Sequence, residues 1–409
     1  MADSQHIFEQ YSLVFRGTVN RIHDMERLVT SNLKLGIIAG GQLGKMLIQE
    51  ASKWDIITYV LDNDEDCPAA KIASYFIKGS HLDFDSVYQF GKEVELLTFE
   101  IENVNIEALK KLKSEGHRIV PDPEIFELIQ DKGLQKEFYK KNGIPTSPFK
   151  LCESETAILQ GIEKGEINFP FVQKLRKGGY DGRGVAVINN HDDLKKILSG
   201  ASVIENKVEI TKEIAVIAAR NRKGEVKCYP VVEMLFDPNA NLVDKLICPS
   251  SIAVEQSEKA INFASEIIEL LNMEGLLAVE FFIDSNGSII VNEIAPRPHN
   301  SGHHTIESII TSQFEQHLRA ILNLPLGSTK LKLPSVMINI LGSDGHNGPV
   351  HYEGLTESMA IDGVKIHLYG KKITKPYRKM GHVTVLSSSL ECALKKAEKV
   401  KQLIKAKAW

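Results

Sequence analysis

The chain has 409 residues, of which 43% are hydrophobic and 25% charged, a composition typical of globular proteins that bury a substantial core. Its net charge is −4, and no apolar run approaches the roughly 18 residues that a membrane span needs, so we expect neither nucleic acid nor a membrane as a partner. The five cysteines are scattered and form no C-x-x-C pair, which predicts a reducing, cytoplasmic location without a thiolate metal site.

The first 32 residues form an N-terminal extension that mixes charged and apolar residues. They lack the continuous apolar segment of a signal peptide, and their acidic residues argue against a transit peptide. We therefore expect a poorly ordered or loosely docked extension.

An α/β unit begins after the extension. An apolar strand over 33–39 runs into the glycine loop 40–44 and a helix over 45–54, and a second strand over 56–61 ends at Asp62. The glycine loop favours a phosphate or another anion at the N-terminus of the following helix. It is only a partial match to the dinucleotide fingerprint, and the acidic run after Asp62 would repel a 2′-phosphate.

A later strand over 96–104 runs into a polar end that contains Glu100 and Glu102. If the strand continues, both carboxylates lie on one face at the carboxyl end of the sheet, where open α/β sheets gather ligands. The alternative is a solvated strand end with Asn103 capping the next helix.

The middle of the chain contains a second glycine-rich loop. A helix over 133–142 and a strand over 169–174 precede the segment 176–184, which has four glycines and three basic residues in nine positions. Backbone N–H groups of such a loop can approach phosphates closely, so we interpret it as a phosphate-handling loop. Strands over 203–205, 214–219 and 228–234 and a helix over 257–271 follow.

Two apolar runs then flank Asn286-Gly287, the strongest short-range signal for a hairpin with a type I′ turn. If these are the two loop residues, Ser285 pairs with Ser288 and Glu280 lies opposite Glu293. Like charges in this position are destabilising unless a cation lies between them, and Mg²⁺ prefers one or two carboxylates completed by water and phosphate oxygens. The alternative is an ordinary hairpin with solvent-facing glutamates and a register shifted by one.

The last part is predicted to contain a helix over 312–322 and, after a change of character near 327, short strands over 335–341, 364–369 and 382–386 and a Lys-rich helix over 389–405. The basic loop 370–382 indicates contact with a substrate or phosphate, although plain surface charge explains it as well.

Taken together, four motifs resemble the ATP-grasp superfamily and, within it, the N5-carboxyaminoimidazole ribonucleotide synthetase family. They are GQLGKM at 41–46, TFEIENV at 98–104, GGYDGRG at 178–184 and NEIAPRPHNSGH at 292–303. The basic loop that ends in Gly381-His382 also matches, and the resemblance covers the chain from about residue 34 to its end.

The resemblance implies an α/β and α+β protein, an ATP-grasp fold with a Rossmann-like domain over 33–131, an ATP-grasp domain over 132–328 and a small β-rich domain over 329–409. It implies carboxylation of 5-aminoimidazole ribonucleotide (AIR) with ATP and bicarbonate in purine biosynthesis, Mg²⁺ with Mn²⁺ as a substitute, and a homodimer.

The resemblance also implies roles for individual residues. In the nucleotide site, Lys132 and Lys174 would contact phosphates, Glu205 and Val208 would frame the adenine, Glu213 would bind the ribose, and Asn292 would support the metal or phosphate. The loop that would close over the triphosphate is Gly179, Tyr180, Asp181, Gly182, Arg183 and Gly184. Glu280 and Glu293 would hold Mg²⁺. The AIR site would comprise Gln42, Glu100, Tyr180, Asp181, Arg183, Lys371 and Arg378. The residues nearest the chemistry would be Arg297, His299 and Asn300, which face the bicarbonate-derived group, with Asp181 and Lys371 beside them.

Two positions depart from the family pattern. Ala39 replaces a common loop glycine, from which we expect a slightly different backbone approach to the AIR phosphate. Lys132 stands where arginine is usual, which keeps the charge but loses the planar fork.

The implied mechanism begins with phosphorylation of bicarbonate to carboxyphosphate, because bicarbonate itself is a poor electrophile. The amine of AIR then attacks either carboxyphosphate or released CO₂, and the sequence leaves both routes open. Asp181 and His299 are alternative acceptors of the amine proton, and each also has a purely structural interpretation.

Three other functions compete with this one. Formate-dependent glycinamide ribonucleotide transformylase typically follows its Arg-Pro-His with Asp-Thr-Gly, whereas Asn300-Ser301-Gly302 stands here. An NAD-dependent oxidoreductase leaves Glu280, Glu293 and the second glycine loop unexplained. A nucleotide sensor without turnover would be expected to lack one metal carboxylate, and both are present.

Overall fold

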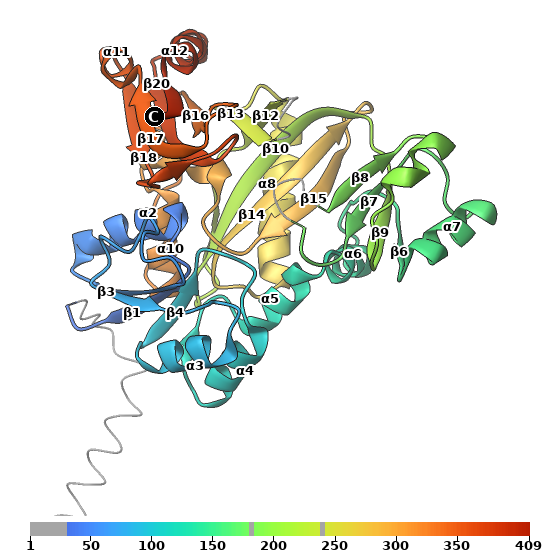
Figure 1. The fold of residues 1–409 in the computed structure, drawn as a ribbon, viewed down its shortest axis with the longest axis horizontal. Helices are drawn as coiled ribbons and strands as arrows, with labels where there is room; N and C mark the ends of the chain where they lie inside the picture. Colours follow the sequence, from blue (N-terminus) through green and yellow to red (C-terminus); the bar gives the residue numbers. More distant parts are fainter. Residues whose placement is uncertain (1–30, 180–183, 238–241) are drawn as a thin grey trace, which may run out of the picture.

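The computed structural model describes residues 31–179, 184–237 and 242–409 (Figure 1). The predicted extension, except for its last two residues, and the loop residues Tyr180 to Arg183 lie outside the described part. The described residues form four sheets. Figure 1 shows a parallel one in blue and cyan, a small green one on the right, and a long one that runs from the middle to the upper left; the fourth is a small three-stranded sheet in the C-terminal part.

The N-terminal part is an open parallel sheet in the order β3-β2-β1-β4-β5. Its strands are β1 (Lys34–Ile38), β2 (Ile57–Asp62), β3 (Tyr75–Lys78), β4 (Leu96–Phe99) and β5 (Arg118–Ile119). Its helices are α2 (Gln42–Ala51), α3 (Phe84–Lys92), α4 (Ile106–Ser114) and α5 (Pro123–Gln130), with the short 3₁₀ helix η2 (Ser52–Trp54) after α2. Alternation along β1 sends Leu35 and Ile37 to the face covered by α2, and Ile38 to the face covered by α3 and α4. The strand order reverses between β1 and β4, so this switch point is where a ligand is expected.

The second part is a four-stranded antiparallel sheet in the order β6-β9-β7-β8. Its strands are β6 (Phe149–Cys152), β7 (Phe171–Leu175), β8 (Val185–Ile188) and β9 (Ser202–Asn206). The accompanying helices are α6 (Lys132–Lys141), α7 (Glu155–Glu163) and η3 (His191–Lys196).

The third sheet has nine strands and continues into the C-terminal part, in the order β15-β14-β10-β12-β13-β16-β20-β18 with β11 beside β10. Its strands are β10 (Ile210–Arg220), β11 (Val226–Cys228), β12 (Val232–Asp237), β13 (Leu242–Cys248), β14 (Gly275–Asp284), β15 (Ile289–Ala295), β16 (Ser335–Leu341), β18 (Val364–Leu368) and β20 (Lys379–Leu386). Smaller strands β17 (Gly348–Glu353), β19 (Ile373–Thr374) and β21 (Lys405–Ala408) form a three-stranded sheet. The helices here are α8 (Val254–Leu270), η4 (Asn300–Gly302), α9 (Thr305–Ser308), α10 (Gln313–Ile321), α11 (Leu355–Met359) and α12 (Leu390–Leu403).

Some predicted elements end or divide elsewhere. The strand predicted over 96–104 ends at Phe99, so Glu100 and Glu102 lie in a loop, and Asn105 rather than Asn103 caps α4. The strand predicted over 228–234 is two strands, because Pro230 lacks the N–H that a continuous ladder needs. The C-terminal helix ends at Leu403, and the chain then enters β21.

The β14–β15 hairpin confirms the pairing of Glu280 with Glu293 but not the predicted turn. Asp284, not Ser285, pairs with Ser288, so the loop has three residues and Gly287 adopts φ +79°. A β-bulge between Glu280 and Phe281 leaves Asn292 as an extra residue in β15. The one-residue shift at the turn is thereby cancelled before the chain reaches Glu293.

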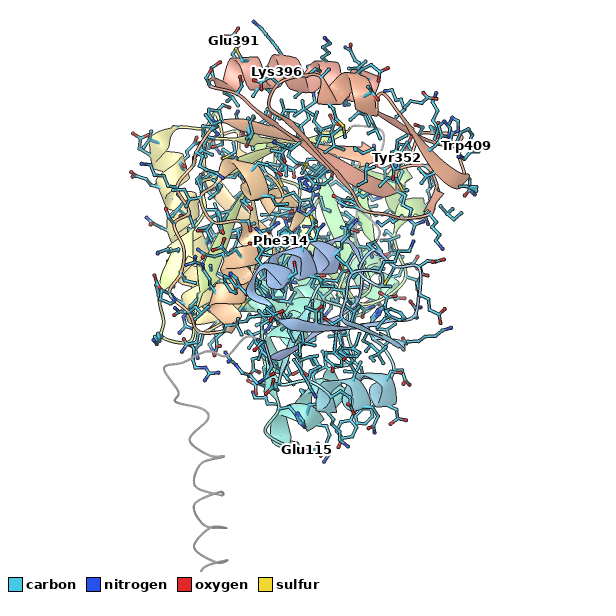
Figure 2. The ribbon with its side chains drawn as sticks, turned by 90° about the vertical axis from the view of Figure 1, so that its left-hand side faces the viewer. Glu115, Phe314, Tyr352, Glu391, Lys396 and Trp409 are labelled. Carbon is cyan, nitrogen blue, oxygen red and sulfur yellow. The ribbon has the colours of Figure 1, made fainter. Side chains whose placement is uncertain are left out.

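Helix α10 joins the parts of the molecule into one core. Phe314, Leu318 and Ile321 pack with β1 and α2 of the N-terminal sheet, and Tyr369 from the C-terminal part enters the same cluster. Phe314 is 1% exposed and lies near the centre of Figure 2, whereas Glu115 and Lys396 lie at its lower and upper ends. The loops that follow β1, β4 and β15 are therefore fixed in position relative to one another.

Candidate active site

The first glycine loop binds carboxylates of the protein itself. Backbone N–H groups of Gly41 and Gly44 each donate to Glu100 over 2.7 Å, and the N–H of Gly40 donates to Asp62 over 2.7 Å. Glu100 thus lies at the N-terminus of α2, the position for which the sequence predicted a phosphate or another anion. Asp62 accepts from the loop, so its carboxylate is not placed to bind the ribose of a dinucleotide. The oxidoreductase interpretation thereby loses its main support.

Close approach explains the glycine at position 41, since a Cβ there would overlap Glu100 Oε1. Ala39 adopts φ +70°, so the backbone keeps the left-handed conformation that the missing glycine would favour. Gln42 begins α2 directly after this loop.

The Glu100 carboxylate interacts with the glycine loop and with two basic side chains. Burial raises the pKa of Glu100 to about 7, against the opposing effects of the Gly44 and Gly41 N–H groups and the charges of Arg297 and Lys371. The structure therefore brings residues from three distant stretches of sequence around one carboxylate. Arg378, the other basic residue predicted here, donates to Ile373 O over 2.6 Å.

Arg297 is paired with Glu102. The distance from Arg297 Nη2 to Glu102 Oε1 is 2.6 Å, and Arg297 Nη1 donates to Pro298 O. Burial lowers the pKa of Arg297, but Glu102 outweighs it and holds that pKa above its usual value. Arg297 Nε is buried without a hydrogen-bond partner among the described residues, which leaves one donor for a ligand.

A second cluster joins the small sheet to the large one. Lys174 Nζ lies 3.1 Å from Glu205 Oε2 and donates to Asn292 Oδ1 over 2.9 Å. Lys136 Nζ lies 2.9 Å from the other oxygen of Glu205. Burial raises the pKa of Glu205, but Lys174 and Lys136 outweigh it and hold that pKa below its usual value. Glu205 is therefore a buried carboxylate fixed by two lysines.

Sequence reasoning missed Lys136, although it lies one helical turn after Lys132 on α6 and so shares its face. It also missed the clamp at the start of this helix. Asp131 caps α6 and receives two hydrogen bonds from Arg176, from Nε over 2.9 Å and from Nη2 over 2.8 Å. The clamp joins α6 to the base of the second glycine-rich loop.

The carboxylates on the large sheet share one face. In the strand register, Ala215 lies opposite Glu280 and Glu280 opposite Glu293, while Glu213 is two residues from Ala215. The opposite face of these strands packs on α8. The bulge turns Asn292 to the same side as Glu293, which explains how Lys174 reaches Asn292 while Lys132 Nζ donates to Glu293 Oε2 over 2.7 Å.

The pKa values of Glu280 and Glu293 are shifted in opposite directions. Burial, then the negative charges of Glu293 and Glu213, raises the pKa of Glu280. Lys132 instead lowers the pKa of Glu293. The side chain of Glu280 is 15% exposed and that of Glu293 is 47% exposed, so Glu293 is the more accessible carboxylate.

These donors fit a hard cation. Two carboxylates and an amide oxygen are oxygen ligands of the kind that Mg²⁺ takes, and a cation would offset the burial and the carboxylate repulsion that raise the pKa of Glu280. The described residues contain no group of three or more His, Cys, Asp or Glu side chains that could hold a metal alone. The site thus suits a cation that is completed by phosphate oxygens and water.

His299 lies next to Glu280 as a neutral imidazole. Its Nε2 is 3.7 Å from Glu280 Oε1, and burial, with Arg297 and Lys379, lowers the pKa of His299 to about 3. The backbone N–H of Ser301 donates to His299 Nδ1, so the ring proton is on Nε2. Gln313, which sequence reasoning missed, donates to and accepts from the backbone of His299.

The remaining predicted residues surround these groups. Gly179 and Gly184 frame the second glycine loop, and Gly184 O accepts from Leu175 N over 2.8 Å. Val208 lies half-buried between β9 and β10. The predicted contacts of Tyr180, Asp181, Gly182 and Arg183 fall outside the described residues.

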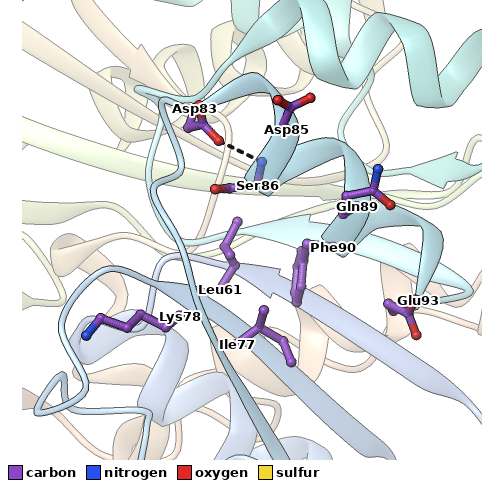
Figure 3. Close-up of a pocket in the computed structure, with 9 residues that line it drawn as sticks. All are labelled: Leu61, Ile77, Lys78, Asp83, Asp85, Ser86, Gln89, Phe90 and Glu93. Carbon is purple, nitrogen blue, oxygen red and sulfur yellow. Dashed lines mark hydrogen bonds between the residues drawn. The ribbon is translucent and has the colours of Figure 1, made fainter.

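A separate pocket of about 370 Å³ lies between β2, β3 and α3 (Figure 3). Leu61, Ile77 and Phe90 lie in its interior in the view shown, and acidic side chains such as Asp85 and Glu93 surround them. It contains none of the predicted site residues, so it is not the candidate active site.

Comparison with known proteins defines the class first. Residues 137–314 match the ATP-grasp domain family, 33–130 the ribonucleotide synthetase preATP-grasp domain, and 335–396 the phosphoribosylaminoimidazole carboxylase C-terminal domain. The protein is an ATP-grasp enzyme with the three-part organisation that the sequence motifs implied.

Relatives narrow the class to one family. The chain is 37% identical over 363 residues to the N5-carboxyaminoimidazole ribonucleotide synthase of Staphylococcus aureus, covering 87% of this chain and 93% of the relative. The solved structure of the Thermotoga maritima synthetase has a TM-score of 0.85 and 46% identity, covering 92% of this chain and all of that one. The chain belongs to the N5-carboxyaminoimidazole ribonucleotide synthase family.

Two further relatives bear on function. The Aspergillus clavatus synthase, solved with ADP and AIR, has a TM-score of 0.83 and 31% identity, covering 91% of this chain and 99% of that one. The chloroplastic phosphoribosylaminoimidazole carboxylase of Vigna aconitifolia is 37% identical over 365 residues, covering 87% of this chain but only 64% of the relative. The chain therefore spans about two thirds of that plant protein.

Within residues 31–179, 184–237 and 242–409, no helix is long and apolar enough to cross a membrane.

Proposed function

We propose that this chain carboxylates AIR with ATP and bicarbonate, giving N5-carboxyaminoimidazole ribonucleotide, ADP and phosphate. The observation that carries the proposal is the arrangement around β15. One short segment runs from Glu293, in the carboxylate face beside Lys132, to Arg297, beside Glu102 and Glu100, and on to His299, which lies next to Glu280. A nucleotide site and a second-substrate site thus share one continuous piece of chain.

In this proposal the nucleotide half uses the cluster between the two sheets. Lys132 and Lys174 bind phosphate oxygens, which replace Glu293 and Asn292 as their partners. Glu205 and Val208 frame the adenine, Glu213 binds the ribose, and the loop 179–184 excludes water from the labile carboxyphosphate. Mg²⁺, or Mn²⁺ in its place, would be held by Glu280 and Glu293 and would neutralise phosphate charge.

The substrate half uses the residues around Glu100. Gln42, Glu100, Lys371 and Arg378, with Tyr180, Asp181 and Arg183, bind AIR. Arg297 stabilises negative charge on the carboxyl group through donors that Glu102 keeps oriented. His299 donates from Nε2, because its Nδ1 is occupied by the Ser301 N–H. As donor at that atom, His299 is better placed to orient the carboxyl group than to accept the amine proton, which favours Asp181 as the acceptor.

The deciding experiment is ADP release from Mg-ATP with AIR, with and without bicarbonate. We expect turnover that requires both AIR and bicarbonate. Turnover that requires glycinamide ribonucleotide and formate instead would overturn the proposal. The homodimer and the cytoplasmic location stay predictions, to be tested by sedimentation and by fractionation.

A further inference from the structure

Asn339, a residue of β16, makes a reciprocal pair with Asn300 in the active-site segment. Asn300 Nδ2 donates to Asn339 Oδ1 over 3.0 Å, and Asn339 Nδ2 donates to Asn300 Oδ1 over 3.2 Å. Asn339 is 6% exposed, so its amide is held away from solvent. The pair joins the segment after β15 to the C-terminal part of the sheet.

A third hydrogen bond determines which way both amides face. Asn339 Nδ2 also donates to the backbone carbonyl of Val243 over 2.8 Å. A carbonyl can only accept, so the NH₂ end of Asn339 must lie toward Val243 and its oxygen toward Asn300 Nδ2. Asn300 is thereby left with one N–H and one oxygen lone pair in fixed directions.

We propose that Asn339 is a positioning residue for the carboxylation step and acts by fixing the orientation of the Asn300 carboxamide. The inference rests on the proposed function, in which Asn300 faces the carboxyl group being made. Without Asn339, the carboxamide of Asn300 would turn about its terminal torsion, because few barriers hold such a torsion in one orientation. Donor and acceptor would then exchange places in front of the substrate. Pairing of β13 with β16 supplies both Val243 and Asn339, so assembly of the sheet completes the site.

A double-mutant cycle tests this role. The variants are Asn300→Ala, Asn339→Ala and the double variant, and the measurements are kcat for AIR carboxylation, KM for ATP, and carboxylated product formed per ADP. We expect each single variant to lower kcat roughly 10- to 100-fold. This factor corresponds to the free energy of one hydrogen bond to a charged group. KM for ATP should change by less than about twofold, and product per ADP should fall, because phosphorylation continues while transfer fails.

The double variant should be no slower than Asn300→Ala within about twofold, because Asn339 acts through Asn300. Ser335→Ala is the matched control: Ser335 is a buried residue of the same strand whose hydroxyl has no hydrogen-bond partner among the described residues. It should leave kcat and the product ratio unchanged. Asn339→Asp serves as a second variant of similar volume that cannot donate to Val243.

Additive losses in the double variant would overturn the inference, as would normal kcat in Asn339→Ala. Failure of both Asn339 variants to bind ADP would also overturn it, because the residue would then be needed for the fold alone. Absence of AIR turnover by the unaltered protein would overturn the proposed function together with this inference, whereas turnover with additive losses overturns the inference alone.

Discussion

Glu280 and Glu293 face one another across the β14–β15 hairpin, and their pKa values are displaced in opposite directions. Lys132 lowers the pKa of Glu293, whereas burial and two neighbouring carboxylates raise the pKa of Glu280. Glu293 is therefore the stronger acid of the pair. Glu293 is the residue whose carboxylate pairs with Lys132 and whose side chain is 47% exposed.

Replacement of Glu293 by Gln should abolish ADP formation while the protein stays folded. The amide keeps the shape of the side chain but loses the charge that would bind the cation and orient Lys132. ADP release and the thermal unfolding midpoint of the variant provide the measurement. Near-normal turnover would remove Glu293 from the metal site.

Glu100 should make the stability of the protein depend on pH. Its folded-state pKa is about 7, above the ordinary value of 4.5, so between these two pH values the folded protein keeps a proton that the unfolded chain releases. The free energy of unfolding should therefore fall as pH rises through this window, by up to about 3 kcal/mol from this group.

The measurement is urea unfolding of the unaltered protein and of Glu100→Gln at several pH values between 4.5 and 8. The difference between the two curves should change across the window and level off above pH 7. Parallel curves would show that Glu100 does not titrate there.

At the scale of elements, the ends of α6 and of the second glycine loop are held by the Asp131–Arg176 clamp. Arg176 makes two hydrogen bonds to one carboxylate, and Arg176 O accepts from the backbone N–H of Lys132. The clamp thus fixes where α6 begins and so where Lys132 points. A glycine at 133 leaves room for it, since a Cβ there would lie 2.7 Å from Arg176 Nε.

Replacement of Arg176 by Lys should raise KM for ATP by roughly tenfold with a smaller effect on kcat. Lysine keeps the charge but cannot make the planar two-point contact, so α6 and the loop lose their common anchor. Steady-state kinetics measures the change. Arg319→Lys, at a partly exposed pair on α10, is the matched control and should leave KM unaltered. Equal kinetics for the two variants would contradict the role of the clamp.

On the scale of the whole molecule, α10 ties three parts together. Its apolar face packs on β1 and α2, Tyr369 from the C-terminal part enters the same cluster, and His317 Nε2 lies 2.8 Å from Thr98 Oγ1 of β4. The nine-stranded sheet also runs without interruption from β15 to β18. The predicted domain boundaries at residues 131/132 and 328/329 stay a prediction. Buried residues from the segments on either side pack together in one cluster.

Replacement of Phe314 by Ala should lower the free energy of unfolding by about 3–5 kcal/mol, the usual cost of removing a buried phenyl ring. Because the ring lies where the parts meet, differential scanning calorimetry should show the whole transition move to lower temperature. Phe84→Ala, at a side chain that is 39% exposed, should cost much less. A shift confined to one of several transitions would mean that the parts unfold independently.

The sequence by itself determined the α/β start, the hairpin that carries Glu280 and Glu293, and the family, but it left several strands and helices unpredicted, among them β3, α3 and β13. Periodicity, turn residues and motifs are local signals, and each of these features is encoded locally. The hairpin shows the limit of such signals, because the three-residue loop and the bulge at Asn292 were invisible and their effects on register cancelled.

Only the tertiary structure decided what each carboxylate does. Glu100 fills the anion position of its own glycine loop, Lys136 fixes Glu205, and Asn339 holds Asn300 across 39 positions of sequence. Contacts of this kind depend on which strands become neighbours and on how deeply a charge is buried. Burial and partner choice are properties of the packed molecule, so residue type and spacing alone do not specify them.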